Sequence, residues 1–152
     1  METIDPEMAR RVWQRVQGTG DPSPVGPDLP TMIQQELADA AAYLHLSRLF
    51  SGHYGQLLRQ MYHQEQAHAA CLKGVCRVTT GKRCSPRLPK ILREKPLLTL
   101  QRCYQRELQS AAQYEARAGD SRFGQTFARL AQQEQEHCRI LLELLGTFSP
   151  KE

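Results

Sequence analysis

The stretch Gln64-Glu65-Gln66-Ala67-His68 returns later in the chain as Gln133-Glu134-Gln135-Glu136-His137, so the spacing Glu-x-x-His occurs twice. Glutamate and histidine three residues apart lie on one face of a helix, about 4.5 Å apart along its axis. One such pair can hold one metal ion and reach towards a second. A single glutamate precedes each pair, Glu36 the first and Glu107 the second. Four carboxylates and two imidazoles of this kind are the ligand set of a two-metal site in a four-helix bundle.

The repetition extends beyond these six residues. Residues 34–43 align with residues 105–114, where Gln, Glu, Leu, a pair of alanines and Tyr recur at equivalent positions. After a gap of two residues in the alignment, residues 55–68 match residues 124–137 through a shared Gly-Gln and a shared Gln-Glu-Gln-x-His. We therefore interpret the chain as two copies of one helical hairpin.

The chain has the length of one small all-α domain with a short extension in front of it. Its 152 residues are enough for a single buried core. Residues 1–28 are expected to form a short helix from Asp5 to about Val16, anchored by Trp13, and a Gly/Pro linker. Residues 29–146 are expected to form the bundle. Its predicted helices span residues 29–50, 56–80, 96–118 and 121–145, with turns at 51–55 and 119–120 and an end at Gly146.

The candidate ligands occupy core positions of the predicted helices. Along the last three helices, apolar residues and ligands together follow alternating spacings of three and four, which is typical of the inward face of a bundle. The apolar members are Leu58, Met61, Leu72 and Val75; Leu97, Leu100, Tyr104, Ala111 and Tyr114; and Phe123, Phe127, Leu130, Leu141 and Leu144. A buried carboxylate costs several kcal/mol unless it is paired or bound to metal. Two divalent cations are therefore expected to neutralise the cluster.

The predicted topology requires a long connection between the second and third helices. The two Glu-x-x-His helices can face each other antiparallel about a pseudo-twofold axis only if the second and third helices run parallel. The fifteen residues 81–95 can span about 50 Å when extended. That exceeds the length of about 38 Å of a 25-residue helix. We expect a crossover along the outside of the bundle, with Pro86 and Pro89 in it.

Charge, hydropathy and cysteine pattern exclude several classes of protein. The formal charge of +4 comes from scattered Lys and Arg, so we expect a solvated surface and no nucleic-acid partner. No apolar run is long enough for a membrane span, and the N-terminus lacks a basic start followed by an apolar stretch. We therefore expect no membrane partner and a cytoplasmic location. Five cysteines without a Cys-x-x-Cys pair favour reduced thiols over a disulfide scaffold or a thiolate metal site.

Over residues 29–145 the doubled Glu and Glu-x-x-His pattern resembles the ferritin-like superfamily, and the short form resembles its rubrerythrin-type members. The resemblance implies a ferritin-like four-helix bundle with two iron ions, or manganese, that react with peroxide or dioxygen. It implies Glu36, Glu65, His68, Glu107, Glu134 and His137 as ligands, with Glu65 and Glu134 as bridges and the four carboxylates as the catalytic groups. There is no paired-cysteine rubredoxin domain, which implies an external electron-donor protein. Ser110 stands where an additional carboxylate is expected.

Three functions remain open from the sequence. The first is a di-iron oxidoreductase towards peroxide or dioxygen; the second is an iron-handling ferroxidase or storage-type protein; the third is a structural bundle stabilised by metal without turnover. The ligand set suits iron, manganese and zinc alike. A homo-oligomer, a dimer, is expected. Tyr43 and Tyr114 lie seven residues after Glu36 and Glu107; a hydrogen bond to a ligand is one interpretation, and ordinary core tyrosines are the favoured one.

Overall fold

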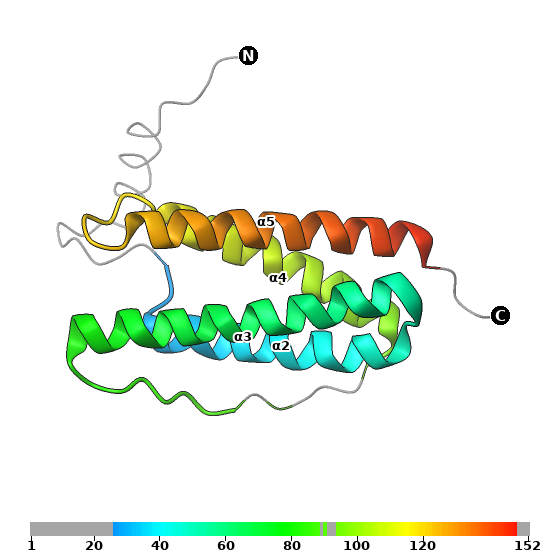
Figure 1. The fold of residues 1–152 in the computed structure, drawn as a ribbon, viewed down its shortest axis with the longest axis horizontal. Coiled ribbons are helices and arrows are strands. Elements are labelled where there is room, and N and C mark those ends of the chain that lie inside the picture. The colour runs from blue at the N-terminus through cyan, green and yellow to red at the C-terminus, as the bar shows by residue number, and fades with distance from the viewer. Residues whose placement is uncertain (1–25, 89, 91–93, 149–152) are drawn as a thin grey trace, which may run out of the picture.

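The structure, a computed structural model, describes residues 26–88, 90 and 94–148. Within these residues the chain forms four helices and no strand (Figure 1). The helices are α2 (Leu29–Leu49), α3 (Gly52–Thr80), α4 (Pro96–Ala116) and α5 (Gly124–Thr147). The predicted all-α bundle of four helices is confirmed. The expected N-terminal helix, including Trp13, lies outside the described residues.

The helices pack as two antiparallel hairpins, α2 with α3 and α4 with α5 (Figure 1). Between the hairpins, α2 lies against α4 and α3 against α5, with fewer close backbone approaches than within each hairpin. Across the diagonal pairs, α2 with α5 and α3 with α4, side chains make the contact, as Tyr43 and His137 do. α3 and α4 run in the same direction, and the described residues of the connection 81–95 follow the outside of the first hairpin (Figure 1). This is the crossover that the parallel arrangement of these two helices requires.

Two apolar clusters fill the core, one towards each end of the bundle. On every helix the candidate ligands stand between a residue of the first cluster and a residue of the second, so a polar layer separates the two. The first cluster consists of Met32, Ile33, Ala69, Leu72, Val75, Tyr114, Phe127, Leu130 and Ala131. The second consists of Tyr43, Leu46, Leu58, Met61, Leu100, Cys103, Ile140, Leu141 and Leu144.

Several helix ends differ from the sequence prediction. α3 begins at Gly52, so the predicted turn 51–55 is almost entirely helical. Gly52 has a φ of 68°, which glycine adopts without steric cost, so the helix can begin directly after Ser51. α5 begins only at Gly124, because Asp120 Oδ1 accepts hydrogen bonds from the N–H groups of Arg122 (2.8 Å) and Phe123 (2.7 Å) and holds a turn. At the other end α5 continues through Gly146 to Thr147, since one helical glycine costs only about 1 kcal/mol.

The predicted inward face needs correction at three positions. On α4, Cys103 is buried where Tyr104 was expected, and Leu97 is 36% exposed. Phe123 is only partly buried and precedes α5. Spacings of three and four both continue such a face, so the pattern could not choose between neighbouring positions near a helix end.

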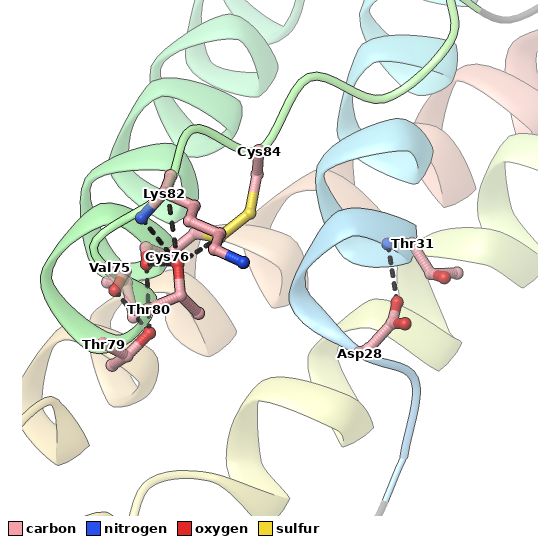
Figure 2. Close-up of a disulfide and its surroundings, with 8 residues drawn as sticks. All are labelled: Asp28, Thr31, Val75, Cys76, Thr79, Thr80, Lys82 and Cys84. Carbon is pink, nitrogen blue, oxygen red and sulfur yellow. Dashed lines mark hydrogen bonds between the residues drawn. A yellow bond between two sulfur atoms is a disulfide. The ribbon is translucent and has the colours of Figure 1, made fainter.

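The expectation that all cysteines are reduced thiols is wrong for one pair. Cys76, near the end of α3, forms a disulfide with Cys84 in the connection 81–95 (Figure 2). Gly81 adopts a left-handed conformation, with φ of 72°, and reverses the chain after α3. The reversal brings the two Cα atoms to 6.3 Å, within the usual range for a disulfide. Cys71, Cys103 and Cys138 are free thiols.

Two glycines at equivalent positions of the repeat allow a close backbone approach at the turn of each hairpin. A Cβ atom on Gly55 would overlap the carbonyl oxygen of Phe50, and one on Gly124 would overlap that of Ala118. Both obstacles are backbone, which cannot turn aside as a flexible side chain can. The shared Gly-Gln of the repeat therefore marks where the start of the second helix of each hairpin approaches the preceding turn.

We expect Gly124→Ala to lower the free energy of unfolding by about 1–3 kcal/mol, because the new methyl group displaces the turn before α5. Gly74→Ala is the matched control. Gly74 lies inside α3 with no atom near a new Cβ, so this change should raise stability by about 0.5–1 kcal/mol. Urea unfolding followed by circular dichroism measures both. Equal effects of the two substitutions would contradict the proposed close approach.

Candidate metal centre

All four helices contribute to one buried polar cluster in the middle of the bundle. The six residues that the sequence singled out are all in it, and their exposed fractions are between 0% and 2%. α2 supplies Glu36, α3 supplies Glu65 and His68, α4 supplies Glu107, and α5 supplies Glu134 and His137. Residues from distant parts of the chain therefore meet in a region that water does not reach.

Two overlapping groups of ligand atoms can be distinguished in this cluster. In each group, three carboxylates and one imidazole offer atoms that all lie within 4.8 Å of one another. The first group is Glu36, Glu65, His68 and Glu134, and the second is Glu65, Glu107, Glu134 and His137. Glu65 and Glu134 belong to both groups, as two bridging ligands would. Such groups could each hold a metal ion.

Both histidines point the same ring atom at the carboxylates. His68 Nδ1 lies 3.1 Å from Glu134 and 3.4 Å from Glu36. His137 Nδ1 lies 2.6 Å from Glu65 and 3.3 Å from Glu107. Nδ1 is therefore the atom that each imidazole presents to the interior of the cluster, and Nε2 faces away from it.

A glutamine from the opposite hairpin contacts the outer nitrogen of each histidine. Gln133 Oε1 lies 2.5 Å from His68 Nε2, and Gln64 Oε1 lies 2.5 Å from His137 Nε2. An amide oxygen can only accept, so these contacts place a proton on Nε2, and once the imidazole is neutral its lone pair is on Nδ1. That tautomer is the one in which Nδ1 can bind a metal ion.

Two tyrosines make a second set of contacts between the hairpins. The Tyr43 hydroxyl donates to Glu107, and the Tyr114 hydroxyl donates to Glu36. Burial and the neighbouring carboxylates raise the pKa of both hydroxyls above the ordinary range, so both remain protonated donors at neutral pH. They are core residues, as favoured from the sequence, and they also bond to candidate ligands, which was the other interpretation.

Six ligand atoms of the cluster have no hydrogen-bond partner, and a bound metal would supply one. Glu65 has neither carboxylate oxygen in a hydrogen bond, and one oxygen each of Glu36, Glu107 and Glu134 is also unpartnered. His137 Nδ1 is close to Glu65 but without hydrogen-bond geometry. Buried unpaired carboxylate oxygens are costly. A divalent cation would coordinate such atoms and balance part of their charge, so the residues present fit a metal site.

The titration behaviour of the cluster shows its unbalanced charge. Burial raises the pKa of Glu107 to about 8, and burial with the charges of Glu36 and Glu134 raises the pKa of Glu65 well above its ordinary range. Burial lowers the pKa of His137, but the carboxylates of Glu107 and Glu134, each 3.3 Å from Nδ1, outweigh it and raise the value to about 10. The pKa of His68 is raised in the same way. Without metal, the folded chain therefore holds protons that the unfolded chain would release.

Sequence reasoning missed the residues that support the ligands. Gln64 and Gln133 were aligned by the repeat but given no role, although their equivalence was the available signal. Asp39, which is 2% exposed and three residues after Glu36, was not noticed at all. It accepts a hydrogen bond of 2.5 Å from Arg106 Nε. It is the counterpart in the first copy of Ser110, so the two halves of the site differ here.

Comparison of the chain with protein-family models, curated proteins and solved structures gives no match. None of the described helices is long and apolar enough to cross a lipid bilayer. The geometry of the cluster is thus the basis for a functional proposal.

Stability of the metal-free chain should fall as the pH rises from 6 to 9. Glu65, Glu107, His68 and His137 have pKa values above those of the unfolded chain, so the folded state binds more protons in this range and loses that advantage as they dissociate. We expect the melting temperature with chelator to drop by about 5–10 °C, the shift for a few kcal/mol at this size. The metal-loaded chain should show no such drop, because metal has replaced the protons. Identical melting curves with and without chelator would contradict this.

Replacing Gln64 or Gln133 by leucine should weaken metal binding about 10- to 100-fold, because the imidazole loses the acceptor that fixes its tautomer. Gln66→Leu is the control. Gln66 belongs to the same motif, but its side chain donates to the Tyr62 hydroxyl, at 2.8 Å, and not to a histidine. Competition with a chromogenic chelator gives the affinities, and imidazole ¹⁵N shifts report the tautomer. If all three variants bind metal like the unaltered chain, the glutamines do not position the histidines.

Proposed function

We propose that this protein is a non-haem di-metal carboxylate protein, with two iron ions as its native metals, that acts as an oxidoreductase on peroxide or dioxygen. The observation that supports it best is the sharing of Glu65 and Glu134 by two groups of three carboxylates and one imidazole. Two metals that share ligands lie about 3.5–4 Å apart, and two groups joined by common carboxylates suit that separation. The resemblance to rubrerythrin-type ferritin-like proteins points in the same direction.

The ligand types alone suit iron, manganese and zinc, but their combination argues against a structural zinc site. Structural zinc sites are usually built from cysteine and histidine, and no cysteine belongs to either group. Hard carboxylate oxygens with a single imidazole per metal suit iron and manganese. Bound there, a pair of such ions would supply the two electrons that reduction of a peroxide bond requires.

The chain's own residues would orient and insulate that reaction. Gln64 and Gln133 hold the Nδ1 atoms of the histidines towards the centre. Tyr43 and Tyr114 keep hydroxyl protons against Glu107 and Glu36, where they steady the carboxylates and balance part of their charge. The apolar clusters on both sides exclude bulk water, which strengthens each electrostatic interaction in the site.

Loading with ferrous ion under anaerobic conditions tests the proposal. We expect two ferrous ions per chain and rapid oxidation by one equivalent of hydrogen peroxide, seen as a ferric absorption band. Oxidation by oxygen with continued uptake of many more ions would instead indicate an iron-handling ferroxidase. Binding of metal without any response to either oxidant would indicate a structural bundle.

Glu107→Ala should abolish binding of the second metal ion and the oxidation signal together. It removes a buried carboxylate, and Ser110, the nearby position where a substitute could have stood, carries none. Glu136→Ala is the matched control, because the Glu136 side chain is 54% exposed and pairs with Arg139 on the surface. It should retain two metals per chain by elemental analysis. Loss of metal in Glu136→Ala but not in Glu107→Ala would refute the assignment of ligands.

A further inference from the structure

The two cysteines of the disulfide, Cys76 and Cys84, differ in their exposure to solvent. Cys76 is 2% exposed inside α3. Cys84 is only partly buried, and both its neighbours, Arg83 and Ser85, are exposed. A thiolate that approaches from solvent therefore meets Cys84 first. Exposed disulfides are the ones that exchange readily, whereas structural bridges are generally protected.

The turn that carries Cys84 is held by hydrogen bonds that do not involve the disulfide. Thr80 Oγ1 donates to the carbonyl of Cys76 at 2.7 Å and accepts from the N–H of Lys82 at 3.1 Å (Figure 2). The N–H of Gly81 donates to the carbonyl of Arg77 at 2.9 Å. Cys84 also packs against the first apolar cluster. The two sulfur atoms would thus stay near each other after reduction, so the bridge can open and close without refolding.

The segment of chain that carries the bridge is strongly cationic, and Asp28, at the start of α2, is the one acidic side chain drawn near it (Figure 2). Residues 66–93 contain seven Lys and Arg and no Asp or Glu. Arg77, Lys82 and Arg83 are exposed, and cationic neighbours favour the thiolate form of a reduced cysteine. Two exposed apolar side chains lie in the same part of the chain, Val78 at 57% and Leu88 at 82%. A basic surface with apolar points fits a partner that has an acidic surface.

We propose that Cys76 and Cys84 are a redox-active pair, separate from the metal centre, which an acidic dithiol protein reduces by attack on Cys84. The incoming thiolate bonds to Cys84 Sγ, the Cys76–Cys84 bond breaks, and Cys76 leaves as a thiolate that takes up a proton. The second thiol of the partner then attacks the mixed disulfide and releases Cys84. The partner is oxidised to a disulfide and the chain is reduced to two thiols, and the same exchange in reverse closes the bridge.

The location of the pair explains what its reduction would change. Cys76 lies eight residues after His68 on α3, about 12 Å along the helix axis, so none of the six candidate ligands is altered. Reduction removes the covalent tie between α3 and the connection 81–95 but leaves the hydrogen bonds of the turn, the four helices and both apolar clusters in place. In the cytosol, where we expect this chain, disulfides are mostly transient and redox-active. The inference does not depend on the identity or presence of the metals.

Reduction of the native full chain is the first test. The chain is treated with dithiothreitol without denaturant, alkylated, and digested, and the peptides with Cys76 and Cys84 are identified by mass. We expect both cysteines to become alkylated while the helical circular dichroism is unchanged. If they become alkylated only at denaturant concentrations that unfold the helices, the bridge is structural and the proposal is wrong.

Single-cysteine variants test the site of attack. With a disulfide reagent, Cys84 in Cys76→Ser should form a mixed disulfide about tenfold or more faster than Cys76 in Cys84→Ser, because Cys76 opens to solvent only by local unfolding. Circular dichroism confirms that each variant is folded. Equal rates would refute attack on Cys84, and the test on the unaltered chain stands even if a variant does not fold.

Small thiols of different charge test whether the bridge reacts preferentially with an acidic reductant. At low ionic strength, the anionic thiol 2-mercaptoethanesulfonate should reduce the bridge faster than neutral 2-mercaptoethanol of similar reactivity. Arg83→Glu should lower the ratio of these two rates about threefold or more. Arg59→Glu, on α3 but far along the sequence from the bridge, is the matched control and should leave both rates unchanged. If Arg83→Glu leaves the anionic and neutral rates in the same ratio, the basic surface does not select an acidic reductant.

Discussion

Six ionisable side chains enclosed at the centre of a four-helix bundle are the constraint on which the rest of this structure depends. Four carboxylates and two imidazoles are at most 2% exposed, and each unpaired buried charge costs several kcal/mol. Two apolar clusters, one on each side, offset part of that cost. In the metal-free chain, bound protons lower the rest of this cost by neutralising carboxylates. In our proposal, two cations do so. Composition, packing and titration at the centre all follow from this arrangement.

The two copies of the hairpin complete each other's half of the site. Tyr43 of the first copy bonds to Glu107 of the second, and Tyr114 bonds to Glu36 in return. Gln64 and Gln133 make the same kind of reciprocal contact with the histidines. A single hairpin therefore contains ligands, but the tyrosines and glutamines that contact those ligands come from the other hairpin. Because the hairpins pack more closely within themselves than against each other, these polar contacts contribute much of what fixes their relative position.

The disulfide and its basic surroundings belong to a different part of the molecule. The bridge ties the end of α3 to the connection 81–95, which the topology requires because α3 and α4 run parallel (Figure 1). A long connection without helix or strand in its described residues has few contacts to fix it. A covalent tie at its beginning, made from one buried and one accessible cysteine, gives this segment a state that depends on redox conditions.

The sequence by itself determined the four helices and the six residues at their centre, because a duplicated Glu-x-x-His set into an apolar periodicity has few other physical solutions. It also predicted the crossover, since the two Glu-x-x-His helices can face each other antiparallel only if α3 and α4 run parallel. Only the tertiary structure decided which polar residues meet across the bundle, as the two glutamines meet the histidines and Arg106 meets Asp39, because each partner is 60 or more residues away. It alone showed the pairing of Cys76 with Cys84, which depends on a left-handed turn at Gly81. The apolar periodicity predicts which face of a helix is buried. It does not predict which side chains will contact each other across the bundle.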